Sequence, residues 1–475
     1  MGGVTQQQRK HWALFGVSIA SFLGCVDFTI VNTALPSLRA DLGTSVDSLQ
    51  WVINGFILAL SSFMVLVGRL ADLHGRKRVL FIGLSVFGLA SLGAGLASQI
   101  QWLIVARVFQ GLACAVLYTA SGAIVASTFD SAEQGKAFGV LFGVNGVGLA
   151  VGPVLGGVIT SAFGWPWIFL INVPFVLLSL AICSFSVDES RAAQASARLD
   201  GLGVILLLIG LPSLVLVIVQ GAAWGWTALP TLALGALALL ALAGFVRVEQ
   251  RVAAPIIDLH LFANRRFVAG VVASFGLALF YCVAFFVMPL YLALIRGASV
   301  QEAGLLLLPT TLGVALLSPW VGRWVDRRGP ALLIKTGLLL FVLSALLQVG
   351  FDRQTSLAYL LLAFVLMGLG WASILGPSTV LGMSSVPEDV GSVAMGSLMT
   401  LHNVGGGLGL ALGVGLYHHF SATPVDDIQG AFLNGYRAVM GFLALASLAA
   451  WASVSLLLRG VPGAVAQVAK PPTAS

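Results

Sequence analysis

The sequence predicts an all-α integral membrane protein with about fourteen transmembrane helices, arranged as two six-helix bundles plus two inserted helices. Hydrophobic residues make up 59% of the 475 positions and charged residues only 9%. Soluble domains carry about a quarter charged residues, so this chain lacks the polar surface that water requires. A charged loop of the pattern Gly-Arg-x-x-Asp-x-x-Gly occurs at 68–75 and again at 322–329. Its repetition indicates two related halves.

The individual spans follow from the length of the apolar runs. A membrane helix needs about 20 mainly apolar residues. No run shows the alternation of a membrane β-strand, so helices are the remaining way to satisfy the backbone. The first run follows Arg9 and Lys10, is too long for a signal-peptide core and is interpreted as an uncleaved helix. The predicted spans are 12–34, 48–70, 78–98, 101–123, 136–161, 165–187, 201–220, 228–248, 267–293, 300–322, 331–350, 356–377, 389–417 and 432–458.

The basic residues indicate the orientation of these spans. With the N-terminus in the cytoplasm, about 19 Lys and Arg residues lie on the cytoplasmic side and about 4 on the other. This bias predicts that both termini are cytoplasmic, in a plasma or inner membrane. The net charge of +6 resides in short loops between apolar runs and does not indicate nucleic-acid binding.

The two charged loops follow the second and tenth spans, so each occupies the same position in its half. We therefore predict an N-terminal six-helix bundle over 1–187 and a linker with two extra transmembrane helices over 188–264. A C-terminal six-helix bundle over 265–458 and a disordered cytoplasmic tail over 459–475 complete the chain.

Two charged residues fall within predicted spans, where charges are costly and are functional candidates. Asp27 lies ~22 Å along the first span, and Arg107 lies ~9 Å below the outer surface. The two are therefore at similar depth, and an ion pair between them would lower the penalty of each. One interpretation is a purely architectural salt bridge. The other is a proton-coupling switch, in which protonation of Asp27 frees Arg107.

Other polar and aromatic residues in the spans are candidates for a substrate-binding cavity. His402 lies ~20 Å into its span, and imidazole exchanges protons near neutral pH, although a lone histidine also serves in packing. Amide side chains either line a wet cavity or bridge helices. Aromatic residues one turn apart face either a pocket or lipid. The predicted substrate-binding residues are Phe28, Asn54, Gln110, Asn145, Tyr281, Phe285, His402 and Asn403.

Glycine-rich motifs are candidates for conformational change. Glycines at four positions of 148–157 leave one face of the fifth span bare around Pro153, which suits either tight packing or a sliding contact. The predicted conformational-switch residues are Gly68, Arg69, Asp72, Gly75, Arg76, Gly148, Gly152, Pro153, Gly156, Gly157, Gly322, Asp326 and Gly329. The four cysteines lie singly in apolar runs and predict neither a metal site nor a disulfide framework.

Taken together, these motifs resemble the major facilitator superfamily. The segments that carry the resemblance are the loops at 68–78 and 322–329, 103–111 in the fourth span, the antiporter-like motif at 148–157, and 27–36 with 165–174. The last two resemble the fourteen-span drug:proton antiporter branch, of the multidrug efflux type. The pair His402-Asn403 departs from the Arg-Gln expected there.

The resemblance implies the major facilitator fold and a proton-coupled exporter, with Asp27 and Arg107 at the coupling positions. It also implies that the 68–78 loop stabilises one closed state through cytoplasmic contacts. Two bundles that rock around a central cavity would give alternating access. The proton gradient would be the energy source, with no cofactor and no metal.

The expected partners are a lipophilic small-molecule substrate, neutral or cationic, together with protons and membrane lipid, and we expect a monomer. A dedicated exporter of a metabolite, siderophore or antibiotic would have the same architecture, and a non-transporting membrane receptor is a further alternative. An enzyme is not predicted, because His, Cys and carboxylate residues are too sparse in the spans to form a catalytic cluster.

Overall fold

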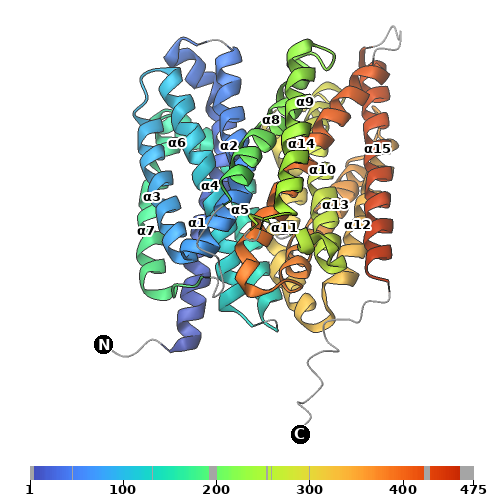
Figure 1. Ribbon diagram of the computed structural model, residues 1–475. Coiled ribbons are helices and arrows are strands. Elements are labelled where there is room, and N and C mark those ends of the chain that lie inside the picture. The colour runs from blue at the N-terminus through green and yellow to red at the C-terminus, as the bar shows by residue number, and fades with distance from the viewer. Residues whose placement is uncertain are drawn as a thin grey trace. The chain divides into compact units, whose positions relative to one another are not determined.

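The computed structural model describes residues 5–44, 46–130, 132–191, 200–252, 255–257, 259–298, 300–421 and 428–459. All regular secondary structure in these residues is helical (Figure 1). The helices are α1 (Gln6–Leu42), α2 (Val46–His74), α3 (Arg76–Gly95), α4 (Ile100–Thr128), α5 (Gln134–Phe163), α6 (Trp167–Leu170), α7 (Asn172–Ser186), α8 (Gly201–Trp224), α9 (Leu229–Glu249), η1 (Leu259–Ala263), α10 (Arg265–Leu294), α11 (Val300–Arg328), α12 (Pro330–Val349), α13 (Leu357–Met383), η2 (Glu388–Val390), α14 (Gly391–Ser421) and α15 (Ile428–Leu457).

The helices match the predicted spans closely. Thirteen helical stretches of the described chain are long and apolar enough to cross a membrane. The predicted span 389–417 corresponds to α14, which has 31 residues but is rich in glycine and is not among the thirteen. The predicted all-helical membrane fold is thus confirmed. The predicted disordered tail over 459–475 lies outside the described residues except for Arg459.

Several helix ends follow from the local sequence. Thr5 caps α1, and the Gln8 side chain accepts a hydrogen bond from the Thr5 backbone N–H, which completes a capping box. Asn264 caps α10 by accepting from the N–H of the second helical residue at 2.9 Å. Gly75 and Gly329 adopt φ of 105° and 78°, a region that favours glycine, and they separate α2 from α3 and α11 from α12.

The chain divides into two compact units. The first comprises Met1–Phe129, Val144–His260 and Val386–Thr400, and the second comprises Asp130–Gly143, Leu261–Ser385 and Leu401–Ser475. The inserted helices α8 and α9 belong to the first unit. The beginning of α5 is assigned to the second unit and the beginning of α14 to the first, so each of these helices contributes to both.

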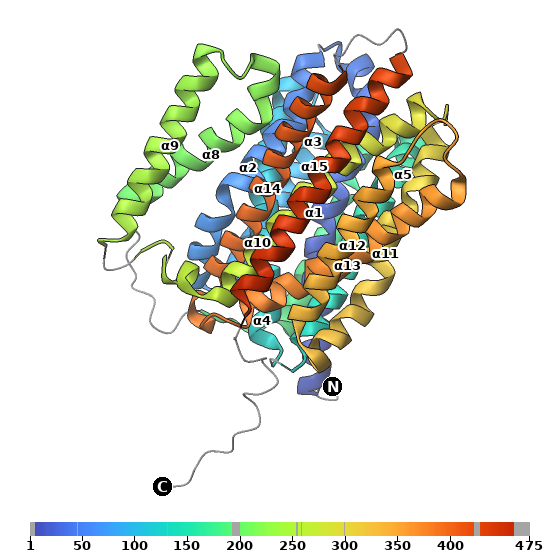
Figure 2. The same ribbon diagram turned by 90° about the vertical axis from the view of Figure 1, so that its right-hand side faces the viewer.

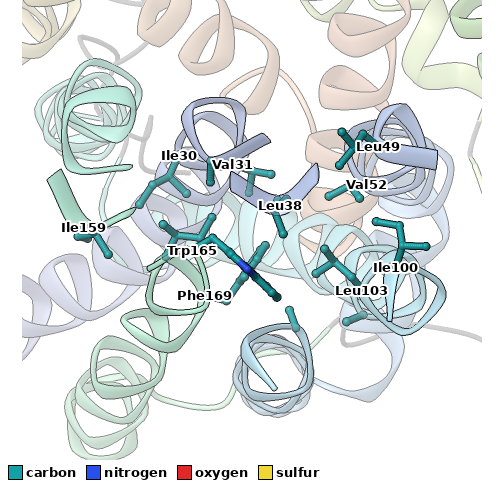
Figure 3. Close-up of a cluster of buried hydrophobic side chains, with 14 of the residues drawn as sticks. Ile30, Val31, Leu38, Leu49, Val52, Ile100, Leu103, Ile159, Trp165 and Phe169 are labelled. Atoms are coloured by element: carbon teal, nitrogen blue, oxygen red, sulfur yellow. The ribbon is translucent and has the colours of Figure 1, made fainter. Parts of the chain in front are cut away.

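The first unit contains a hydrophobic cluster formed by α1, α2, α4 and the segment 159–169 (Figure 3). Trp165 and Phe169 enter it from one side and Leu49 and Val52 of α2 from another. The indole N–H of Trp165 donates to Asp41 at 2.9 Å, which anchors the ring. A second cluster joins α8 to α2, and α9 packs on α8, so the inserted pair lies beside α2 (Figures 1 and 2).

In the second unit, α13 packs against α10, α11 and α12, and α15 packs against α10 and α12. Phe280 of α10 stacks on Phe341 of α12 with ring centroids 4.1 Å apart. A buried network without charges joins α12 to α15, in which the Tyr436 hydroxyl donates to Gln348 at 2.8 Å and Gln348 donates to Ser344 at 3.1 Å. These contacts position α10, which carries several predicted site residues.

Candidate functional site

The predicted pairing of Asp27 and Arg107 is present in the structure, and both side chains are buried. Arg107 of α4 donates through Nη1 to Oδ2 of Asp27 on α1 and, at 3.0 Å, to Oε1 of Gln110. Its Nε donates to the carbonyl of Val52 on α2 at 3.0 Å. The guanidinium also lies over the ring of Phe56, 4.2 Å from its centroid. Arg107 is therefore held by three helices.

The other oxygen of Asp27 is occupied by amide donors. Oδ1 accepts from Nε2 of Gln110 at 3.2 Å and from Nδ2 of Asn172 on α7 at 3.1 Å. Both amides also donate to the hydroxyl of Ser91 on α3, at 2.9 Å and 3.4 Å. Gln110 thus belongs to the ion-pair cluster and is fully buried. Asn172 and Ser91 are absent from the sequence-based site, although each is a polar residue within an apolar run.

This arrangement places two opposite charges in a site closed to solvent. Removal of one partner would leave the other charge buried and uncompensated, which is costly. The two amides keep Oδ1 of Asp27 occupied, whereas Oδ2 receives the guanidinium of Arg107. A proton added to Oδ2 would therefore compete with Arg107 for the same lone pairs. In this geometry a proton on Oδ2 of Asp27 and the hydrogen bond from Arg107 to the same oxygen exclude each other.

The other predicted substrate-binding residues of the first unit lie apart from this cluster. Phe28 is 37% exposed, and its ring centroid lies 6.3 Å from that of Phe56. Asn54 is half-buried. Asn145 donates to the hydroxyl of Ser21 on α1 at 2.8 Å, and its carbonyl oxygen has no hydrogen-bond partner among the described residues. These contacts fit helix bridging by Asn145, with one acceptor left over.

Aromatic and imidazole side chains gather in the second unit. Tyr281 stacks on Trp371 of α13 at 4.4 Å between centroids, and Phe285 contacts the same indole edge to face at 5.8 Å. Nδ1 of His402 lies 2.9 Å from the hydroxyl and 3.0 Å from the carbonyl of Ser274. Nε2 lies 3.4 Å from the Tyr281 hydroxyl. The structure therefore brings together Tyr281, Phe285 and His402.

Trp371 is a component of this aromatic cluster that sequence reasoning missed. Its side chain is 4% exposed, and its indole N–H has no hydrogen-bond partner among the described residues. A buried indole N–H usually finds an acceptor. The only signal in the sequence is a tryptophan in the middle of an apolar span. Asn403, the remaining predicted residue of this unit, is half-buried.

The first charged loop caps the beginning of α14. Asp72 is buried and accepts from the backbone N–H groups of Ser392 and Val393 at 3.1 Å and 2.9 Å. Arg76, also buried, donates to Asp72 and to the Ser392 hydroxyl, both at 3.1 Å. A methyl group on Gly68 would clash with the Ser392 carbonyl. The carboxylate therefore meets the positive end of a helix, where negative charge is favoured.

The second loop copy makes the corresponding contact with α5. Asp326 accepts from the backbone N–H groups of Gly135 and Lys136 at 2.7 Å and 2.9 Å. A methyl group on Gly322 would clash with the Gly135 carbonyl. Each copy of the motif therefore caps the fifth helix of the other half. A third carboxylate, that of Glu189, caps α3 by accepting from two N–H groups at 3.1 Å, and sequence reasoning did not identify it.

The glycine face of α5 lies against α1. Methyl groups on Gly152 and Gly156 would clash with side chains or backbone of α1, and one on Gly148 would fit tightly against α1. A methyl on Gly157 would meet nothing within 4 Å, so this predicted residue does not belong to the contact. Pro153 lies within α5, as expected for a helix that bends. The corresponding glycines of α14, at 405, 406, 409 and 413, lie against α10 in the second unit.

Two related helical halves, with a buried ion pair in one and a repeated capping loop, define an integral membrane protein of duplicated architecture. The sequence matches the model of the Major Facilitator Superfamily over residues 17–410 and 267–473, and the chain belongs to this family. It is 32% identical to the Tetracenomycin C resistance and export protein of Streptomyces glaucescens, over 88% of this chain and 77% of that protein.

Two further comparisons agree. The chain is 32% identical to the Multidrug resistance protein Stp of Mycobacterium tuberculosis, over 88% of this chain and 78% of that protein. The structure resembles that of the human organic anion transporter MFSD10 (TETRAN), with a TM-score of 0.70 at 18% identity, over 94% of this chain and 99% of the other. That likeness shows the fold. The family membership implied by the motifs is confirmed.

Proposed function

We propose that this protein exports lipophilic small molecules, neutral or cationic, across a plasma or inner membrane in exchange for protons. The observation that carries the proposal is the buried cluster of Asp27, Arg107, Gln110, Asn172 and Ser91. The names of the relatives, a multidrug resistance protein and an antibiotic resistance and export protein, support an outward-directed cargo.

In the proposed coupling step, a proton from outside binds Oδ2 of Asp27 and displaces Arg107. Gln110 and the Val52 carbonyl still hold the guanidinium, while the two amides stay on Oδ1. The energy of the step is modest, since one elementary charge crossing the membrane supplies about 2.3 kcal/mol per 100 mV. Proton and cargo need not touch, because it suffices that they prefer different conformations.

The conformational change itself is assigned to the two capped helices. Asp72 caps the beginning of α14 and Asp326 caps the beginning of α5. These two caps stabilise the conformation seen here. In the opposite conformation these caps are released, and α5 shifts along its glycine face against α1. The proposed conformational change therefore releases one aspartate cap from each copy of the charged loop.

The aromatic cluster of the second unit is the proposed contact for the cargo. Trp371 has a buried N–H without an acceptor among the described residues, and the rings of Tyr281 and Phe285 pack beside its indole. A planar apolar compound with a hydrogen-bond acceptor would use both features. Trp371→Phe keeps an aromatic side chain and removes the indole donor, so cargo affinity should fall about 5- to 10-fold, the worth of one hydrogen bond. Unchanged affinity would exclude the indole as a cargo donor.

The sidedness of the protein is also part of the proposal. The basic loops support cytoplasmic N- and C-termini, since cytoplasmic loops carry an excess of Lys and Arg. Cysteine substitutions at the exposed positions Arg78 of α3 and 352–354 should be labelled by impermeant reagents from opposite sides. Labelling of both positions from the same side would contradict the topology.

Transport in reconstituted vesicles tests the function directly. Vesicles with an imposed pH gradient are offered a panel of lipophilic compounds, and cargo movement and internal pH are followed together. Compound-dependent proton movement supports exchange, and binding without any movement would contradict it. A second candidate is a dedicated antibiotic exporter, favoured by the relative named for tetracenomycin C. Activity with one compound of the panel, rather than with many, would identify that alternative.

A further inference from the structure

The ends of the inserted helix pair bring two carboxyl groups close to Arg69 of the first charged loop, and two of these three charged groups are buried. Glu249, the last residue of α9, is 4% exposed. Asp200 is the N-cap of α8. Arg69 of α2 is 9% exposed. All three belong to the first unit, and none of their contacts enters the ion-pair cluster around Asp27.

The two carboxyl groups approach the same point. Asp200 accepts from the backbone N–H groups of Leu202 at 3.1 Å and Gly203 at 2.8 Å, as an N-cap does. Oε2 of Glu249 accepts from the N–H of Ile257 at 3.0 Å. A methyl group built on Gly203 would clash with Oδ2 of Asp200 and lie 2.8 Å from Oε1 of Glu249. Both oxygens therefore lie close to this glycine.

One carboxyl oxygen of Glu249 lacks a hydrogen-bond donor among the described residues. Oε1 of Glu249 is buried and has no hydrogen-bond partner among the described residues. The charged groups that act on it are Asp200 from α8 and Arg69 from α2. Nε of Arg69 is itself buried without a partner, and the described structure contains no ion pair between Arg69 and Glu249. A buried carboxylate oxygen facing a second carboxylate, without a donor, is costly.

We propose that Glu249 and Asp200 hold one proton between them, carried on Oε1 of Glu249, so that the inserted helices form a second proton-binding site. A proton satisfies the unpartnered oxygen and removes the repulsion between the two acids. The proton is placed on Glu249 because both oxygens of Asp200 already accept N–H groups at the positive end of α8, whereas Oε1 of Glu249 has no partner among the described residues. A metal ion fits less well, since Ca²⁺ requires six to eight oxygen ligands and the described residues contain no group of three metal-binding side chains.

Infrared spectroscopy of the purified full-length protein tests the site without any transport assay. The proposal predicts a carbonyl-stretch band of a protonated carboxylic acid at neutral pH that E249Q removes. D200N should shift the frequency of this band, since the hydrogen-bond acceptor changes. D27N is the matched control and should leave the band in place, which separates this site from the proposed coupling site. Identical carboxylic-acid regions in wild type and E249Q would overturn the proposal, and an unshifted band in D200N would overturn the sharing.

The pH dependence of unfolding provides a second test with a defined sign. If the folded state keeps a proton that the unfolded chain loses above about pH 4.3, the folded-to-unfolded ratio of wild type relative to E249Q falls about tenfold per pH unit in that range. An ionised Glu249 stabilised by Arg69 would give no such fall, because both states are then ionised above about pH 4.3 and wild type gains on E249Q only as the pH rises toward that value. That outcome would overturn the proposal. Because glutamine mimics the protonated acid, E249Q is expected to fold.

Discussion

Each copy of the charged loop places an aspartate at the beginning of a helix, but the two aspartates differ in their burial and in their other hydrogen-bond partners. Asp72 is fully buried and pairs with Arg76, which is 2% exposed. Asp326 is half-buried, and its hydrogen bonds come from two backbone N–H groups. Alanine at position 72 therefore removes a cap and strands a buried guanidinium, whereas alanine at position 326 removes only the cap.

The magnitudes follow from these contacts. Loss of a helix N-cap costs about 0.5–2 kcal/mol. Removal of one member of a buried ion pair costs about 3–5 kcal/mol, because the remaining charge is left uncompensated. Asp72→Ala should therefore lower the free energy of unfolding by about 3–5 kcal/mol, and Asp326→Ala by about 1–2 kcal/mol. The two copies are similar in sequence, so a sequence comparison alone would predict equal effects.

Two measurements test this difference. Denaturant unfolding in detergent gives the loss of stability, and hydrogen exchange reports on the capped amides directly. Asp72→Ala should accelerate exchange at Ser392 and Val393, and Asp326→Ala should do so at Gly135 and Lys136. Asp72→Asn is the control, since it keeps one acceptor oxygen and should give an intermediate result. Equal losses for the two alanine variants, or unchanged exchange at 392–393 in Asp72→Ala, would refute the reasoning.

The remaining predictions concern the glycine face of α5 and the loop between α12 and α13. Gly152→Val should abolish transport, because its side chain would clash with α1, whereas Gly157→Val should retain it, because the space beside Gly157 is open; equal activity of the two variants in vesicles would contradict the assigned contact. The backbone N–H of Gln354 and the hydroxyl of Thr355 lower the pKa of Asp352. The stabilisation from Asp352 is therefore present above about pH 3.9 and is lost as the pH falls through the lowered value, so Asp352→Asn should flatten the acid limb of a thermal-unfolding profile.

The bundle architecture could be predicted because a helix that crosses lipid must be apolar over its whole length. Long apolar runs, a positive-inside bias and a duplicated loop each depend on local composition. The pairing of Asp27 with Arg107 was accessible for the same reason, since a charge within an apolar run stands out. Depth along each helix then placed the two side chains together.

The rest of the site depends on which helix faces meet, and a single sequence does not contain that information. In the sequence, Asn172 and Ser91 do not differ from other polar residues in apolar runs. In the structure, Asn172 of α7 donates to Asp27 and to Ser91 of α3. The cap of Asp72 on Ser392 joins residues 320 positions apart. Trp371 was indistinguishable from a lipid-facing tryptophan, and only its burial beside Tyr281 marks it.

Proton-driven efflux by Asp27→Asn, measured in reconstituted vesicles alongside wild type, tests the central claim most directly. The variant keeps the shape of the side chain and the amide contacts but cannot exchange a proton at neutral pH. The account predicts that it inserts and folds, loses cargo accumulation against a gradient and no longer shows cargo-dependent proton movement. Wild-type accumulation driven by a pH gradient in Asp27→Asn would contradict the assignment of Asp27 as the coupling residue.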